Sequence, residues 1–379
     1  MRVLVSGGGT GGHLVPGLNL LRELRAEGND LHLVRPGRKV EEHFLAGLHG
    51  VTTHELSLPR SRLALPFALT KSLLPARRIL AQSRIDIVVG LGGAGSVPSC
   101  LAAYSQRIPF VLLEQNVVPG RVVKLLARLA RRVYTSFPET VPLLGRASAI
   151  ATGMPLRRGL GHGADPALRR ALLGDAACLV LVVGGSQGAE ALNRSLPRLF
   201  AQLPAAKSGR VAFLHIAGPD KEASARSAYA DHGLRATVRT FTQDMSGLYA
   251  AADLVVCRGG GTTLVEVAAA SRPAVVIPYP WHKDRQQFHN AAWFERRGAM
   301  VVLEQSRIEA GMGRAELEAL LEDSEKRRAM GERGRLAVPI DAGPRIARDL
   351  YRVARESNVA LALEGGFTAL DQGSSEEEL

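Results

Sequence analysis

Two glycine-rich segments, each placed directly after a short apolar run, constrain the fold of this sequence more than any other feature. The first, Gly7–His13, follows Val3–Ser6, and the second, Gly184–Gly188, follows Leu179–Val183. A strand, a glycine loop and a helix in that order direct backbone N–H groups and a helix N-terminus at one point, which favours an anion, most often a phosphate. Two such units predict two α/β domains that face each other across a cleft.

The order of the expected elements also favours two doubly wound α/β domains. A chain of 379 residues is long for one hydrophobic core. Continuous apolar runs alternate with helical patterns, as is typical of parallel strands that helices cover on both faces. The strands predicted in this way are Arg2–Ser6, Asp30–Val34, Ile85–Gly90, Pro109–Leu113 and Arg132–Thr135 in the first half, and Cys178–Val183, Val211–Ala217, Ala236–Phe241, Leu254–Cys257 and Ala274–Pro278 in the second.

The segment that follows the last strand of the first half marks a domain boundary, because it contains Gly153 and Pro155. We predict one domain over residues 1–155 and a second over residues 156–339. A helix is expected over Ile340–Arg355, and in such two-domain folds the final helix can cross back to the first domain. Residues 356–379 hold six acidic residues and no basic one, which predicts a disordered acidic tail.

The composition narrows the possible partners. A net charge of +12 is compatible with nucleic acid, an anionic membrane surface or phosphorylated ligands. No recognition-helix motif or RNA-binding aromatic motif occurs, so no nucleic-acid partner is expected. Cys100, Cys178 and Cys257 lie far apart, and no Cys/His spacing resembles a zinc site, so we expect reduced thiols and no metal. Neither a transmembrane run nor a signal peptide is recognised.

The segment Pro59–Arg78 mixes Leu and Phe with Arg and Lys. A basic amphipathic surface of this kind could lie on an anionic bilayer. The alternative is a helix that faces the core and has a solvated basic face. The sequence leaves both readings open.

Five glycine or polar elements follow predicted strands, at the carboxyl ends where open α/β sheets bind ligands. They are Gly7–His13, Gly90–Ser96, Leu113–Asn116, Gly184–Gly188 and Cys257–Thr263. One glycine loop is often only a tight turn, but five in both halves favour a site. The first loop lacks the G-x-G-x-x-G frame of a Rossmann dehydrogenase, and no Gly-Lys-Ser/Thr follows it, so a Walker A loop is also excluded.

Two polar features lie close to these loops in the sequence. Glu266 follows the Gly259–Gly261 turn, where a carboxylate can accept two ribose hydroxyls; a Glu on a helix surface is the alternative. Gln286 and Gln287 end the run that begins at His282. Paired amides can bind sugar hydroxyls, although such a run can also be a solvated loop.

Taken together, these motifs resemble the MurG family of bacterial glycosyltransferases, which have the GT-B fold of two Rossmann-like domains. The resemblance covers roughly residues 1–355. It rests on Gly8–His13, Glu114–Asn116, Gly184–Ala189, Val256–Arg258 with Glu266, and His282–Gln287.

The resemblance implies a reaction and its partners. N-acetylglucosamine would pass from UDP-N-acetylglucosamine to the C4 hydroxyl of the muramoyl sugar of lipid I, with inversion, giving lipid II and UDP. The enzyme would lie peripherally on the cytoplasmic face of the inner membrane and contact an anionic membrane surface. Other cell-wall synthesis proteins are also conceivable partners, and no cofactor is implied.

The resemblance also implies roles for individual residues. On the donor side, Ser186 and Gln187 would contact the phosphates, Phe241 and Thr242 would border the uracil, and Gln286 and Gln287 would bind the sugar. The other donor residues would be Arg157 near the nucleotide, Glu266 on the ribose, and Gly261, Thr262 and Thr263. The residues between the donor and the acceptor would be Thr10, Gly11, Gly12, His13, Gly93, Ser96 and Asn116.

The chemistry of an inverting transfer agrees with this set. No Asp-x-Asp motif is present to carry a metal between the phosphates, so N–H groups, helix N-termini and cations would stabilise the leaving diphosphate. His13 is the candidate base, since imidazole accepts a proton near neutral pH. Alternatively, His13 only donates a hydrogen bond to a phosphate.

Two departures from the family pattern stand out. Met154 replaces an Asn in a Gly-Asn-Pro turn, and Gly259–Gly261 contains extra glycine, which predicts a looser turn. Three other functions are less favoured. A UDP-N-acetylglucosamine 2-epimerase would carry carboxylates and a His around C2, and no such set is identified. The motif set argues against a glycolipid synthase with a diacylglycerol acceptor, and His13, Glu266, Gln286 and Gln287 argue against a catalytically silent binding subunit.

Overall fold

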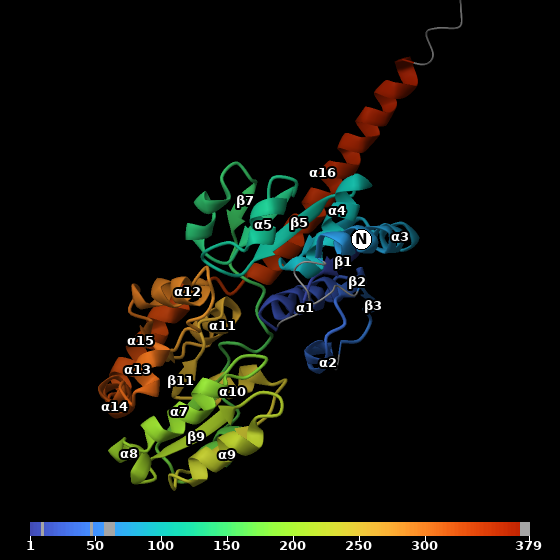
Figure 1. The fold of residues 1–379 in the computed structure, drawn as a ribbon. Helices are drawn as coiled ribbons and strands as arrows, with labels where there is room; N and C mark the ends of the chain where they lie inside the picture. Colours follow the sequence, from blue (N-terminus) through green and yellow to red (C-terminus); the bar gives the residue numbers. More distant parts are fainter. Residues whose placement is uncertain (9–10, 46–47, 57–64, 372–379) are drawn as a thin grey trace, which may run out of the picture.

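The computed structural model describes residues 1–8, 11–45, 48–56 and 65–371. Two lobes are visible in Figure 1, one built from the first half of the chain and one from the second. Thr10 lies outside the described residues, as does the beginning of the basic segment Pro59–Arg78.

Each lobe contains one fully parallel sheet. The first has the order β3-β2-β1-β4-β5-β6-β7 and the second the order β10-β9-β8-β11-β12-β13, so the predicted α/β class is confirmed. The strands are β1(Arg2–Ser6), β2(Asp30–Arg35), β3(Thr52–Glu55), β4(Ile87–Gly90), β5(Phe110–Glu114), β6(Arg132–Thr135), β7(Ala149–Ala151), β8(Cys178–Val183), β9(Val211–Ile216), β10(Ala236–Arg239), β11(Leu254–Cys257), β12(Ala274–Val276) and β13(Met300–Val302).

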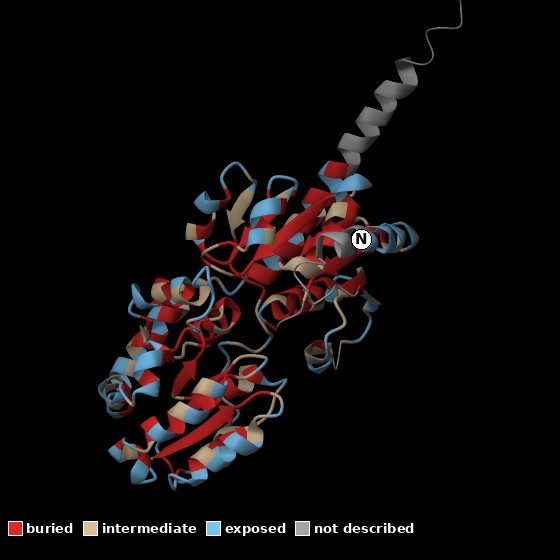
Figure 2. Ribbon diagram, in the orientation of Figure 1, coloured by how far each residue is buried: buried red, intermediate tan, exposed pale blue. Residues whose placement is uncertain are grey.

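Helices cover both faces of each sheet, which leaves the central strands buried in Figure 2. The first lobe contains α1(Gly11–Ala26), α2(Lys39–Leu45), α3(Leu65–Gln82), α4(Val97–Ser105) and α5(Arg121–Leu126). The second contains α6(Pro166–Leu173), α7(Glu190–Phe200), α8(Pro204–Lys207), α9(Glu222–Ala230), α10(Met245–Ala251), α11(Gly261–Ala269), α12(Gln286–Glu295), α13(Gln305–Glu309), α14(Arg314–Glu322) and α15(Ser324–Ala337). Short 3-10 turns lie at Ala94–Ser96, Pro138–Thr140 and Pro142–Leu144.

Sequence analysis missed three strands, and all three lie at sheet edges. These are β3, β7 and β13. They are three or four residues long and are partly exposed. Edge strands are covered less completely, so they lack the long apolar run by which the central strands are recognised.

The last helix, α16(Ala342–Asp371), returns from the second lobe to the first, as Figure 1 shows. Its buried side chains Ile346 and Leu350 join Leu14 and Leu18 of α1 in one apolar cluster. The hydroxyl of Tyr134 on β6 also donates to the Asp349 carboxylate at 2.8 Å. The final helix is therefore part of the first lobe's core.

The helix also continues further than the sequence analysis expects. Residues 356–371, assigned there to a disordered tail, are helical in the structure. This stretch contains several Ala and Leu residues, which are strong helix formers. Three of the six acidic residues on which the expectation rested, Glu376, Glu377 and Glu378, lie in residues 372–379, outside the described residues.

A buried amide joins the two lobes. Asn290 on α12 has no exposed surface. Its Oδ1 accepts from the backbone N–H of Val117 at 2.9 Å, and its Nδ2 donates to Asn116 Oδ1 at 3.0 Å and to the Gly259 carbonyl at 3.1 Å. One side chain thus connects the loop after β5 with the loop after β11.

An aromatic cluster lies beside this amide. Phe137, after β6, packs edge to face on Trp293 of α12 with ring centroids 4.9 Å apart. The Trp293 indole donates to Glu139, and the Arg297 guanidinium lies 3.6 Å from the Trp293 ring centroid. Apolar packing and a cation–π contact therefore stabilise this end of the interface.

We predict that Asn290→Ala destabilises the folded chain. The change leaves the Val117 N–H and the Gly259 carbonyl without their buried partner, at a cost of about 1–3 kcal/mol for each unsatisfied group. Urea denaturation followed by tryptophan fluorescence measures the effect. The control is His289→Ala, one position away on α12 and exposed; equal midpoints for the two variants would contradict the prediction.

Candidate active site

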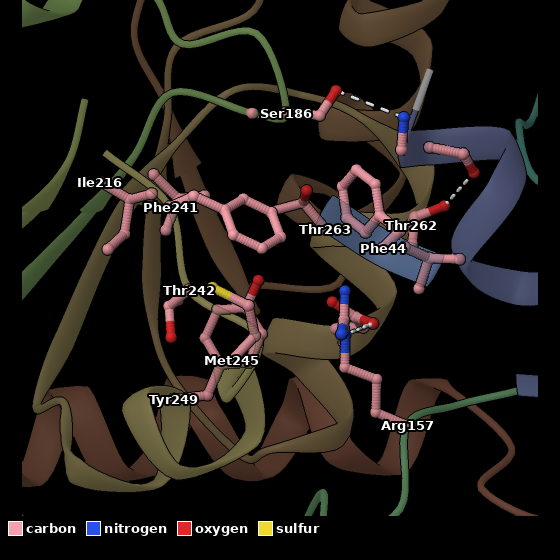
Figure 3. Close-up of a pocket in the computed structure, with 16 residues that line it drawn as sticks. Phe44, Arg157, Ser186, Ile216, Phe241, Thr242, Met245, Tyr249, Thr262 and Thr263 are labelled. Carbon is pink, nitrogen blue, oxygen red and sulfur yellow. Dashed lines mark hydrogen bonds and ion pairs between the residues drawn. The ribbon is translucent and has the colours of Figure 1, made fainter. Parts of the chain in front are cut away.

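The glycine loops of the two lobes touch each other. The backbone N–H of Gly11, at the start of α1, donates to Ser186 Oγ at 3.3 Å, and Thr262 Oγ1 donates to the Gly12 carbonyl at 2.6 Å. Both contacts are drawn in Figure 3. The segments after β1, β8 and β11 therefore meet at one place, which is the arrangement predicted for a ligand site at strand ends.

A cavity opens at this meeting point. It is lined by Gly11, Gly12, Val15, Phe44, Arg157, Val183, Gly185, Ser186, Ile216, Phe241, Thr242, Met245, Tyr249, Thr262, Thr263 and Glu266. Both lobes contribute, and most of the predicted donor residues are present.

A buried ion pair between two lining residues, Arg157 and Glu266, forms part of the wall of this cavity. Arg157 Nε donates to Glu266 Oε1 at 2.8 Å, and only 3% of Glu266 is exposed. Burial raises the pKa of the Glu266 carboxyl, and the Arg157 guanidinium opposes that rise. The reading of Glu266 as a surface residue is wrong: the carboxylate faces the cavity and is held by a cation.

The Gly259–Gly261 turn is tightly packed, contrary to the expectation of a looser turn. A Cβ at Gly261 would lie 2.1 Å from the Gln115 carbonyl oxygen in the other lobe. A Cβ at Gly259 would lie 2.4 Å from the Gln287 carbonyl oxygen. Glycine is required here because backbone approaches backbone. Met154, the other departure, is buried in the apolar core.

The paired glutamines lie beside the cavity and are not among its lining residues. Gln287 Oε1 accepts from the N–H groups of Gly259 and Tyr279 at 3.1 and 2.9 Å. Gln286 Nε2 donates to the Val118 carbonyl in the first lobe at 3.3 Å. They begin helix α12, so the reading as a solvated loop is wrong for the two glutamines, whereas His282–Arg285 before them are exposed and lie outside the helix. In this structure Gln287 supports the Gly259 turn and Gln286 connects the lobes.

His13 lies in the first turn of α1 and is partly buried. Burial lowers the pKa of its imidazole below the ordinary value of 6.5. A Cβ at Gly92, in the second glycine loop, would lie 3.7 Å from the His13 ring. Burial thus favours the neutral form of His13, which lies beside the second glycine loop of the first lobe.

The remaining residues expected on the acceptor side are engaged within the protein. Asn116 donates through Nδ2 to Glu114 Oε1 at 3.0 Å, and its Oδ1 accepts from Asn290. Ser96 is buried, and its hydroxyl donates to the Gly93 carbonyl at 3.0 Å. These side chains shape the loops on the first-lobe side of the site.

Sequence analysis missed several residues that line the cavity. Tyr249 and Met245 lie on α10 and Ile216 ends β9, and all three form part of the apolar core. Phe44 comes from α2 in the opposite lobe. No motif marks these residues, because only the packing of the lobes places their side chains at the cavity.

The described residues contain no cluster of three or more His, Cys, Asp or Glu side chains that could hold a metal. The three thiols are buried, and burial raises the pKa of Cys100 and of Cys257 to about 12. Within residues 1–8, 11–45, 48–56 and 65–371, no helix has both the length and the apolar character needed to span a bilayer.

Family models match both halves of the chain. Residues 3–135 match the glycosyltransferase family 28 N-terminal domain, and residues 179–337 match the glycosyltransferase family 28 C-terminal domain. Among solved structures, Acinetobacter baumannii MurG superimposes with a TM-score of 0.71 at 28% identity, covering 93% of this chain and 99% of that one. A putative UDP-N-acetylglucosamine 2-epimerase from Listeria monocytogenes gives 0.68 at 14% identity, over 91% and 94% of the two chains, which shows a shared fold alone.

Curated relatives match over nearly the whole chain. A protein of Chromohalobacter salexigens is 36% identical over 94% of this chain and 98% of its own length, and one of Salmonella arizonae is 37% identical over 93% and 98%. Both are named UDP-N-acetylglucosamine–N-acetylmuramyl-(pentapeptide) pyrophosphoryl-undecaprenol N-acetylglucosamine transferase. With both halves matching glycosyltransferase family 28 and this identity over the full length, the chain belongs to the MurG family of GT-B glycosyltransferases.

Proposed function

We propose that this protein transfers N-acetylglucosamine from UDP-N-acetylglucosamine to the C4 hydroxyl of the muramoyl sugar of lipid I, giving lipid II and UDP. The observation that carries the proposal is the cavity between the two sets of strand ends, which combines facing glycine loops with a buried carboxylate. The names of the full-length relatives support the same donor and acceptor.

The donor occupies the second-lobe side of the cavity. Phe241 and Thr242 border the uracil, and Glu266 accepts hydrogen bonds from the ribose hydroxyls. Arg157 stays beside Glu266, with Nε 2.8 Å from the carboxylate, and opposes the rise in the carboxyl's pKa that burial causes. Thr262 and Thr263 lie at the same wall, on the first turn of α11.

The diphosphate lies between the two glycine loops. Ser186 and Gln187 flank it from one lobe, and the N–H groups at the start of α1 approach it from the other. As the bond from C1 to the β-phosphate oxygen breaks, UDP leaves with the bonding electron pair. Fixed N–H dipoles and the positive end of α1 stabilise the charge that develops on the leaving group.

His13 accepts the proton of the acceptor hydroxyl while that oxygen attacks C1 from the opposite face, which inverts the anomeric centre. The lowered pKa of His13 supports this role, because a base must be neutral at the working pH. Gln286 and Gln287 bind the donor sugar once the lobes adjust, since their amides now hold protein groups.

The first lobe carries the surface that faces the membrane. Leu74 on α3, Tyr104 on α4 and Leu125 on α5 are 63%, 56% and 71% exposed, and α4 contacts both of the other helices. The exposed basic residues of α3 and α5 are Lys71, Arg77, Arg78, Arg121 and Lys124. Apolar side chains next to basic ones favour binding to an anionic bilayer, which presents the lipid-linked acceptor. The membrane face proposed here is the cytoplasmic face of the inner membrane.

The decisive experiment is a transfer assay. The purified protein is incubated with radiolabelled UDP-N-acetylglucosamine and a short-chain lipid I analogue in detergent, with a chelator present. Label in the lipid product supports the proposal. Epimerised sugar or free UDP without labelled lipid would instead favour the epimerase reading, and label transferred only to diacylglycerol would favour the glycolipid synthase.

We expect Glu266→Gln to abolish recognition of the ribose hydroxyls. The parent protein should bind UDP about 10- to 100-fold more tightly than 2′-deoxy-UDP, because a hydrogen bond to a charged group contributes about 1.5–3 kcal/mol. In Glu266→Gln the two ligands should bind alike. Calorimetry provides both affinities, and the exposed Glu304→Gln serves as the control; a variant that still discriminates would refute the ribose contact.

His13→Ala is expected to lower kcat by about 10²- to 10⁴-fold, as the removal of a general base does. UDP affinity should stay unchanged. In the parent, kcat/KM should fall as pH drops through a pKa below 6.5, because protonation of the imidazole removes the base and burial lowers its pKa. If His13→Ala instead weakens UDP binding and spares kcat, His13 is a phosphate ligand and not the base.

The double variant Leu74→Ser/Leu125→Ser should lose more than about 10-fold in affinity for vesicles of anionic phospholipid. The reason is that two leucine side chains are no longer transferred from water into the bilayer. Sedimentation with the vesicles measures the loss. Leu336→Ser is the matched control, since Leu336 is 86% exposed on the second lobe. Equal sedimentation of the two variants would argue against this surface.

A further inference from the structure

One cavity residue is not accounted for by the donor site of the second lobe. Phe44 belongs to α2 in the first lobe, yet its ring lines the cavity together with Phe241 and Glu266. In the view of Figure 3 the Phe44 ring is drawn between Thr263 and Thr262 of α11. An apolar side chain from one lobe thus reaches the ligand side of the other.

The Phe44 ring has contacts on two sides. It packs edge to face on Phe241 with centroids 5.2 Å apart. Its far tip approaches α1, where a Cβ at Gly11 would lie 2.7 Å from the Phe44 ring. The ring therefore spans from the base-side aromatic residue to the helix N-terminus proposed to face the diphosphate.

The helix that carries Phe44 is firmly anchored. Glu41 on α2 is fully buried, and its carboxylate accepts from the N–H of Arg38 at 3.0 Å. Phe44 and Leu45 pack against the apolar core of the first lobe. The position of the ring is thus fixed by the first lobe and not by the loop that holds Phe241.

The neighbouring residue strengthens this contact between the lobes. The His43 ring stacks on Phe241 at 5.2 Å, and Gln243 Nε2 donates to the His43 carbonyl at 3.3 Å. Two consecutive residues of α2 therefore contact the segment that follows β10. Because this segment borders the base site, α2 is a part of that site whenever the lobes are together.

The second lobe contributes two aromatic side chains to the cavity, Phe241 and Tyr249. A nucleobase gains binding energy from aromatic contact and from exclusion of water, at about 1–3 kcal/mol per stacked base. Phe44 is the aromatic side chain that the first lobe adds to this cavity, in edge-to-face contact with Phe241.

We propose that Phe44 is a nucleotide-contacting residue of the donor site, supplied by the acceptor lobe, and that its ring closes over the nucleoside of the bound UDP-sugar. This inference rests on the proposed function, because it needs a uridine nucleotide in the cavity. Its consequence is a coupling: the donor is enclosed only when α1, with His13, has approached the second lobe.

The test compares nucleotide binding by Phe44→Ala, Phe44→Leu and Phe44→Tyr with binding by the parent. UMP and UDP are titrated by calorimetry in the absence of acceptor, and thermal unfolding is recorded for each variant. Phe44→Leu retains an apolar side chain, so it controls for the packing of α2. Leu336→Ala, exposed on the second lobe, controls for unspecific effects of a substitution.

The expected result is a loss of about 5- to 100-fold in affinity for both UMP and UDP in Phe44→Ala. Phe44→Tyr should restore most of the affinity and Phe44→Leu only part of it. In the transfer assay the donor KM should rise by a similar factor while kcat at saturating donor changes little.

Equal or tighter binding by Phe44→Ala would overturn the inference, because the ring would then merely fill an empty pocket. The inference would also be overturned if Phe44→Leu bound the nucleotides as tightly as Phe44→Tyr, since an apolar side chain that only supports α2 would then be sufficient. Failure of the proposed function looks different: the parent itself would then bind neither UMP nor UDP.

Discussion

The whole structure depends on one constraint, which is that two parallel sheets direct their carboxyl ends at the same interface. The contacts that satisfy it join a backbone group of one lobe to a side-chain hydroxyl of the other: Gly11 N–H donates to Ser186 Oγ, and Thr262 Oγ1 donates to the Gly12 carbonyl. Only glycine permits such an approach, as the 2.1 Å from a Cβ at Gly261 to the Gln115 carbonyl oxygen shows. The cavity lies where the two lobes come together, and residues of both lobes line it.

The interface is unequal at its two ends. At the α12 end, Asn290 is buried with three hydrogen bonds, and Phe137 packs on Trp293. At the α2 end, the contacts are aromatic and partly exposed, and they surround the cavity. Burial of an amide among fixed partners is costly to undo, whereas an aromatic contact can be exchanged for a ligand at little cost. The α12 end is therefore suited to hold the lobes together while the α2 end admits the donor.

The same asymmetry divides the chemistry. The second lobe supplies a carboxylate and an aromatic ring to the cavity, with Arg157 beside the carboxylate, and the first lobe supplies an imidazole and a basic, leucine-bearing surface. Burial raises the pKa of the Glu266 carboxyl and lowers the pKa of the His13 imidazole, and at Glu266 the Arg157 guanidinium opposes the rise. A transferase that joins a water-soluble donor to a membrane-bound acceptor needs both environments within one cleft.

The sequence by itself determined the fold class, the central strands and the loops that bear the site, because long apolar runs and glycine clusters are local signals. It could not predict β3, β7 and β13, whose short edge strands lack such a signal, or the continuation of α16 to Asp371. Only the tertiary structure decided that Gln287 supports the Gly259 turn, that Asn116 is held by Asn290, and that Phe44 crosses to the other lobe. The physical reason is that these contacts join residues up to about two hundred positions apart, and a side chain's partner at that range is set by how the lobes pack and not by its neighbours in the chain.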